Sequence, residues 1–320
     1  MGRYIFKRIV YMTLTLLATI VLLFTLLELV PGDPAMVIAG EGATEASIAA
    51  IHEKWGLDDP YIVRLGRYLG NLFKGDLGIS YMTQQPIAPA LFARLPLTLI
   101  IAFWGVFVGT ILGIIVGVIS AVRQFSIMDR VTTAVTLFGA SAPSFWLAML
   151  FVLVFSIKLK WLPATGSYSL IHWILPVATI GLMCSAGVTR MTRSSMLEVI
   201  RMDYIRTARA KGQTELKVII RHALRNAFIP ILTQVGAQFC GFLGGTVLVE
   251  SVYAIPGLGD YIITAVKQKD VPVVLSGVVI VCAMCAVVNL VIDLAYAFID
   301  PRIQATYGFK QKAKKKEGDA

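Results

Sequence analysis

Residues 97–120 read LTLIIAFWGVFVGTILGIIVGVIS, a run without a single charged side chain. A helix of about 20 apolar residues is long enough to cross the roughly 30 Å hydrocarbon core of a bilayer. Inside lipid every backbone N–H and C=O has to be bonded within the protein, which a helix achieves by itself. This stretch therefore predicts a helical integral membrane protein.

The rest of the chain repeats this pattern. Hydrophobic residues make up 57% of the 320 positions and charged residues only 15%, whereas soluble domains average about 45–50% and about 25%. The sequence predicts an all-α membrane fold with six transmembrane helices, over residues 9–30, 97–120, 132–157, 172–190, 229–252 and 271–298.

The distribution of these spans predicts the organisation of the chain. The expected parts are a cytoplasmic N-terminus with the first helix (1–30), an extracytoplasmic helical cap (31–96), a transmembrane core (97–299) that includes a cytoplasmic loop (191–228), and a basic cytoplasmic tail (300–320).

The positive charges predict the orientation. If both termini are cytoplasmic, 20 of the 29 Lys and Arg residues lie on cytoplasmic segments and 9 on outer ones. Cytoplasmic loops of membrane proteins carry such an excess. The net charge of +10 is thus explained by membrane orientation, and no nucleic-acid partner is expected.

The sequence lacks the common motifs for ATP hydrolysis, for hydrolytic enzymes and for zinc binding. It contains no GxxxxGK[ST] phosphate-binding loop and no GxSxG or HExxH motif, so neither ATP hydrolysis by that route nor an intramembrane enzyme is expected. Cys282 and Cys285 have CxxC spacing, but no second pair or nearby His completes a zinc site. No metal site and no catalytic residue is predicted.

Small and polar residues inside the spans are candidates for packing or transport. Four glycines recur every fourth residue and so share one helix face, where another helix can approach closely. These glycines serve either simple helix packing or packing beside a transport pathway whose helices move. They are Gly105, Gly109, Gly113 and Gly117. Pro143 is expected to kink the third span.

Ionisable groups in membrane spans usually face a bundle interior or a water-filled path. Glu250, Asn289 and Asp293 are the candidate pathway residues. Glu250 is expected near the outer end of its span, within reach of the interface. Hydrogen bonding between helices is the alternative role for Asn289 and Asp293.

Two soluble stretches have helical periodicity. In the cap, one run ends at Gly56 and a second at Gly75, which predicts two amphipathic helices. In the loop 191–228, we expect one helix over 195–211 and another over 214–227, meeting at Gly212. The second helix has an apolar face and a basic stripe, as do helices at a lipid surface.

The same loop carries motifs that resemble those of ABC importer permeases of the dipeptide, oligopeptide and nickel group. The resemblance covers nearly the whole chain, and this chain looks most like the first of the two permeases of such systems. The motifs are DYIRTARAKG (203–212), RHALRNA (221–227), PGDP (31–34), GDLGIS (75–80), ESVY (250–253), PGLG (256–259) and DPR (300–302).

The resemblance implies a type I ABC importer permease fold and a coupling helix that docks on an ATPase. Arg206, Thr207, Ala208 and Gly212 stand at the positions of the family's Glu-Ala-Ala…Gly loop, with Arg and Thr replacing the usual Glu and Ala. The expected coupling helix comprises Asp203, Tyr204, Arg206, Thr207, Ala208, Ala210, Lys211 and Gly212.

It also implies the partners and the location. The expected partners are a second permease, two ATPases that bind the ATP and Mg, an outer solute-binding protein, membrane lipid, and a peptide or similar small solute. This chain would need no cofactor of its own. The expected location is the bacterial inner (plasma) membrane.

Two alternatives are an ion-coupled secondary transporter, which would use acids such as Asp293, and a membrane scaffold without transport. The substrate stays open among dipeptides, oligopeptides, glutathione-like molecules and nickel chelates.

Overall fold

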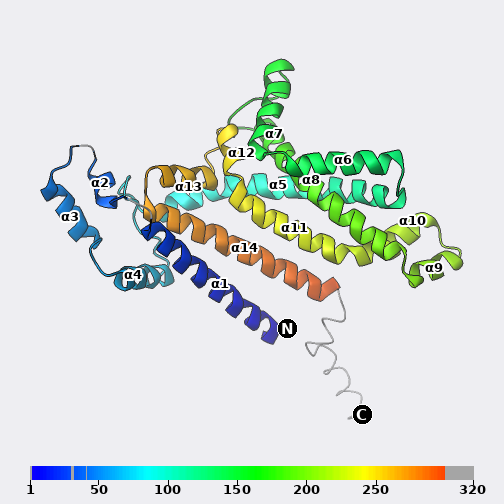
Figure 1. Ribbon diagram of the computed structural model, residues 1–320, viewed down its shortest axis with the longest axis horizontal. Coiled ribbons are helices and arrows are strands. Elements are labelled where there is room, and N and C mark those ends of the chain that lie inside the picture. The colour runs from blue at the N-terminus through cyan, green and yellow to red at the C-terminus, as the bar shows by residue number, and fades with distance from the viewer. Residues whose placement is uncertain (1, 30–31, 41, 300–320) are drawn as a thin grey trace, which may run out of the picture. The chain divides into compact units, whose positions relative to one another are not determined.

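The computed structural model describes residues 2–29, 32–40 and 42–299, and within these it is helical (Figure 1). The only β-structure among the described residues is an isolated antiparallel bridge between Ile79 and Pro86. The predicted all-α class is confirmed. The predicted basic tail (300–320), the DPR motif within it and Pro31 lie outside the described residues.

Five described helices are long and apolar enough to cross a membrane, and a bent pair can supply a sixth span. All six predicted spans have a counterpart. The corresponding helices are α1 (Gly2–Glu28), α5 (Ile87–Val122), α8 (Leu170–Ile200), α11 (Arg225–Gly245) and α14 (Val271–Ile299). The bent pair is α6 (Ile127–Ser141) with α7 (Ser144–Phe151) and the π-helix η1 (Val152–Lys158).

The third span is broken rather than kinked. The chain turns by 106° between α6 and the segment from Ser144 to Lys158. The turn lies at Ala142 and Pro143, which both have extended backbone angles, as expected because proline disfavours helical geometry in the residue before it. A break of this size makes a re-entrant or two-part span.

The remaining helices are short. They are α2 (Pro34–Ala39), α3 (Glu45–Trp55) and α4 (Tyr61–Phe73) in the cap, α9 (Asp203–Ala210), α10 (Glu215–Lys217) and the π-helix η2 (Val218–Leu224) in the loop, and α12 (Val247–Val252) and α13 (Leu258–Lys267) before α14. The two helices expected in the cap are α3 and α4.

The chain divides into two units. The first comprises Leu99–Ile255 with the chain from Val287 onward, and the second comprises Gly2–Thr98 with Pro256–Ala286. Each has its own buried apolar cluster. That of the first unit contains Cys184, Met196, Ile205, Val218 and Ile231, among others, and that of the second contains Leu77, Ile87, Leu91, Leu258 and Val273.

Within the first unit, α8 lies against α5, α6, α7 and α11. The glycine face of α5 makes the first of these contacts possible. A Cβ on Gly109 would lie 2.5 Å from the carbonyl oxygen of Gly181, and one on Gly113 would lie 2.6 Å from the Cβ of Val188. Real side chains do not approach so closely, so these positions of α5 require glycine.

Candidate functional site: the loop between α8 and α11

The predicted coupling helix is α9. The expected single helix over 195–211 is wrong, because α8 continues to Ile200 and the chain breaks at Arg201 and Met202. Met202 has extended backbone angles at the start of α9, and Asp203 places a negative charge in the first turn. A carboxylate there stabilises a helix through the helix dipole, so α9 begins as a separate element.

α9 is held by its apolar side. Ile205 is fully buried and Ala208 is 7% exposed. Both belong to the apolar cluster of the first unit, together with Met196 of α8 and Ala223 of the following π-helix. Burying an isoleucine side chain contributes about 1.5–3 kcal/mol. The coupling helix is therefore packed against the core of its unit.

The other side of α9 faces outward. Of the eight predicted coupling residues, Ala208 alone is buried, and the other seven are exposed. Gly212 has a φ of +74°, a left-handed conformation that glycine adopts without strain. No other atom lies within 4 Å of where its Cβ would be. The turn after α9 thus presents open backbone.

An ion pair closes this turn. The guanidinium of Arg209 donates to Glu215 at 3.1 Å from Nε and at 2.6 Å from its terminal nitrogen. The side-chain hydrogen bond to Glu215 raises the pKa of Arg209 above its usual value. His222 and Gln213 form a second bond, 2.8 Å long, across the same turn. Together these contacts hold α9 and α10 in a fixed relation.

The second expected loop helix (214–227) is not a separate α-helix. It consists of α10, the π-helix η2 (Val218–Leu224) and the first turn of α11. Its basic stripe lies on the exposed side, since Lys217, Arg221 and Arg225 are all exposed. The apolar and basic faces are present, but the helix continues directly into a membrane span.

A partly buried ion pair lies on α8 before its C-terminal end, at a position that sequence patterns did not single out. Arg193 donates to both carboxylate oxygens of Asp129, from Nε at 2.7 Å and from its terminal nitrogen at 2.9 Å. The two residues are 64 positions apart on different helices. In the sequence, each of these residues looks like an ordinary charged residue at the edge of a loop.

The candidate pathway residues occupy different surroundings. Glu250, on α12, is fully buried, and Thr246 donates to its carboxylate at 3.0 Å. The expectation that Glu250 reaches the interface is wrong, because its side chain has no exposed surface. Asn289 is exposed and Asp293 half-buried, one turn apart on α14.

In the second unit, the GDLGIS motif is anchored by two side chains near the start of α14. The carboxylate of Asp270, 2% exposed, accepts from Ser80 Oγ at 2.5 Å and from the N–H groups of Tyr81 and Met82 at 3.1 and 3.3 Å. Ser276 donates to the carbonyl of Leu77 at 2.8 Å. Burial, with Asp270 nearby, raises the pKa of Tyr81 to about 12.

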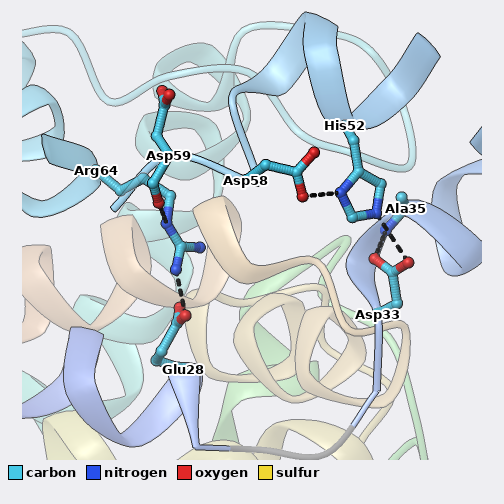
Figure 2. A network of polar contacts seen from close by, with 7 residues as sticks. All are labelled: Glu28, Asp33, Ala35, His52, Asp58, Asp59 and Arg64. Atoms are coloured by element: carbon cyan, nitrogen blue, oxygen red, sulfur yellow. Dashed lines mark hydrogen bonds and ion pairs between the residues drawn. The ribbon is translucent and has the colours of Figure 1, made fainter. Parts of the chain in front are cut away.

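The cap helices are joined by charged groups (Figure 2). His52 of α3 lies between Asp33, at 2.9 Å, and Asp58, at 2.7 Å. Arg64 of α4 pairs with Glu28 and also donates to the carbonyl of Asp59 at 3.1 Å.

A cavity of about 340 Å³ lies within the second unit. Its wall includes His52 and Arg64 of the charged network, together with the aromatic rings of Trp55, Tyr68 and Tyr81. The cap therefore offers both charge and apolar surface.

Two family profiles together match almost the whole chain. Residues 109–305 match the family described as binding-protein-dependent transport system inner membrane component. Residues 1–102 match the N-terminal region of such membrane components.

Curated relatives match over nearly their full length. The dipeptide transport system permease DppB of Alkalihalophilus pseudofirmus is 38% identical over 94% of this chain and 99% of its own. A putative peptide transport system permease of Brucella abortus is 39% identical over 95% and 99%. The glutathione transport system permease GsiC of Escherichia coli is 38% identical over 95% and 99%.

Solved structures share the fold. A chain of the MetNI methionine ABC transporter, in an inward-facing conformation, aligns with a TM-score of 0.55 at 19% identity, over 66% of this chain and 96% of that one. A chain of an amino acid ABC transporter aligns with a TM-score of 0.51 at 17% identity, over 65% and 92%. The expected type I ABC importer permease fold is confirmed.

Proposed function

Because this chain belongs to the family of inner membrane components of binding-protein-dependent transport systems, we propose that it forms half of a peptide pathway and that α9 receives the drive from separate ATPase subunits. The observation that carries the proposal is the two-sided character of α9. Ile205 and Ala208 fix it to the core of its unit, while seven of the eight coupling positions are exposed. A lever needs such a rigid attachment and a free docking face.

The chain is a multi-pass protein of the bacterial inner membrane. In the proposed orientation both termini and the loop that contains α9 are cytoplasmic. The excess of Lys and Arg on these segments supports this orientation. ATPases in the cytoplasm could then reach the exposed side of α9.

The proposed partners divide the work. Two ATPases would bind ATP and Mg, a second permease would complete the pathway, and an outer binding protein would deliver the solute. The absence of a phosphate-binding loop from the sequence supports an assignment of ATP hydrolysis to other chains. This chain would then be a transport subunit rather than an enzyme, with no cofactor of its own.

The proposed substrates are dipeptides and short peptides. The names of the DppB and Brucella relatives support this class. Glutathione is the second candidate, because the GsiC relatives are similar to the same extent. Nickel chelates are a further possibility from the sequence resemblance. Family membership sets aside the ion-coupled carrier and the scaffold.

The test is uptake of a radiolabelled dipeptide by liposomes that contain the complete transporter, with and without internal ATP. We expect uptake to require ATP. We expect Gly212→Asp to abolish uptake without lowering insertion or abundance, because it adds bulk and negative charge to the exposed turn after α9.

Gly40→Asp is the matched control. Gly40 has a φ of +79° and, like Gly212, open space at its Cβ position. Both substitutions place a side chain at a positive φ with open space around it, and the control should transport normally. Normal ATP-driven uptake by the Gly212 variant would disprove the assignment of α9 as the coupling helix. Competition by unlabelled glutathione would separate the two candidate substrates.

A further inference from the structure

The carboxylate of Asp129 joins three separate stretches of the first unit. Its oxygens accept the two bonds from Arg193 of α8, a 2.5 Å bond from Ser120 Oγ of α5, and a 2.9 Å bond from the N–H of Phe125 in the loop before α6. Asp129 itself lies in the first turn of α6 and is 3% exposed. One side chain thus connects the end of α5, the start of α6 and the last turns of α8.

We propose that Asp129 and Arg193 are positioning residues that carry a displacement of α9 into α6. The proposal rests on the proposed coupling function of α9. It assigns to the pair a role in transport that goes beyond holding the fold together.

The first step of this path runs from α9 to Arg193. Arg193 precedes the end of α8 by seven residues, or about 10 Å along the helix axis, and α9 begins three residues after that end. Ile205 of α9 and Met196 of α8 are both fully buried in the same apolar cluster. Helices that are packed in this way move together. A push on α9 therefore displaces the C-terminal part of α8.

The second step runs from Arg193 to α6. An apolar contact holds two helices together but sets no preferred direction between their side chains. A guanidinium that donates two parallel bonds to one carboxylate has a fixed geometry. With Ser120 and Phe125 bonded to the same carboxylate, Asp129 is held against rotation and translation. A displacement of α8 is therefore transmitted to α6.

The third step runs from α6 toward the centre of the unit. After the 106° break the chain continues as α7, which packs against α8 and α12. α12 carries Glu250, the buried candidate pathway residue. The ion pair therefore lies on a continuous connection from the exposed docking face to a buried acid.

The experiment compares two substitutions that keep the charge and alter the geometry. Arg193→Lys removes the two-pronged donor, and Asp129→Glu moves the carboxylate by one methylene. The complete transporter is reconstituted in liposomes, and the number of radiolabelled dipeptides imported for each ATP hydrolysed is measured. Arg130→Lys, at the exposed neighbour of Asp129 on α6, is the matched control.

We expect this ratio to fall at least five-fold in both variants and to stay at the wild-type value in the control. The ratio does not depend on how much complex assembles, so a variant that folds poorly still gives a result. A ratio equal to wild type in both variants would show that the pair serves the fold alone and would overturn the proposal.

Uptake by the wild type distinguishes a failure of the positioning role from a failure of the coupling function. If the wild-type transporter shows ATP-driven uptake but both variants keep the normal ratio, the positioning role fails and the coupling function stands. If the wild type itself shows no ATP-dependent uptake, the coupling function fails, and the proposed role of Asp129 and Arg193 fails with it.

Discussion

The loop helix α9 and the cap helices α3 and α4 are all short helices outside the candidate spans, but different forces hold them. α9 buries Ile205 and Ala208 in an apolar cluster. Neither α3 nor α4 has a fully buried residue. Partly buried aromatic rings pack α3 against Tyr81 and α4 against Phe24, and charged side chains add ion pairs to their neighbours. Apolar burial resists salt and pH, whereas exposed ion pairs are weakened by both.

This difference agrees with the proposed role of α9. A helix that transmits force has to keep its position under load, which burial provides. The cap helices α3 and α4, which have no fully buried residue, can rearrange at lower cost. The following predictions test whether the two regions differ in this way.

The largest effect is expected at Ile205. Ile205→Ala should leave a cavity beneath α9 and lower the free energy of local unfolding by about 2–5 kcal/mol. Hydrogen exchange of residues 203–212 would measure the change. Ile220→Ala is the control, because Ile220 is 54% exposed in the adjacent π-helix. Equal exchange in the two variants would mean that burial does not hold α9.

An intermediate effect is expected at Asp270, a strongly buried acid that anchors the cap. Asp270→Ala removes the acceptor for Ser80 and for the N–H groups of Tyr81 and Met82. A buried N–H without an acceptor costs about 1–3 kcal/mol. Exchange should therefore accelerate across residues 76–86.

The exposed Glu53 of α3 offers a control for this variant, since Glu53→Ala should leave the segment 76–86 unchanged. Unaltered exchange in the Asp270 variant would show that the apolar contacts of Leu77 and Ile87 hold this segment without the carboxylate.

The smallest effect is a pH dependence at His52. Hydrogen bonds to Asp33 and Asp58 raise the pKa of His52 above its usual value of 6.5. Burial raises the pKa of Asp33, but the bonds from His52 and from the N–H of Ala35 outweigh it and lower that pKa overall. Both ring nitrogens of His52 face carboxylates, which suits the protonated ring with its two donors.

The sign of the pH effect follows from the raised pKa. The contribution of His52 to cap stability should be complete below pH 6.5 and should be lost as the pH rises through the raised value. Hydrogen exchange of residues 44–60, corrected for intrinsic rates, should accelerate across this range. His52→Gln should remove the dependence and His172→Gln should keep it. A flat profile in the wild type would contradict the ion-pair account of the cap.

Much of the fold could be predicted because the signals are local. An apolar run long enough to cross a bilayer is a property of consecutive residues, and helical periodicity in the cap appears within a few turns. The glycines of α5 share a face by spacing alone. The stretch 203–212 was identified by resemblance, and its exposure agrees with a docking role.

Other features could not be predicted because they depend on pairings between distant residues. Asp129 finds Arg193 across 64 positions, and Asp270 reaches Ser80 across 190. Nothing near either acid in the sequence indicates its partner. The size of the break at Pro143 and the full burial of Glu250 also depend on which helices pack there.

By itself, the sequence determined that this chain is a helical membrane protein of a transport family, because hydrophobicity and helix formation are local. Only the tertiary structure decided which buried charges meet, because the cost of an unpaired charge selects its partner after the helices have packed.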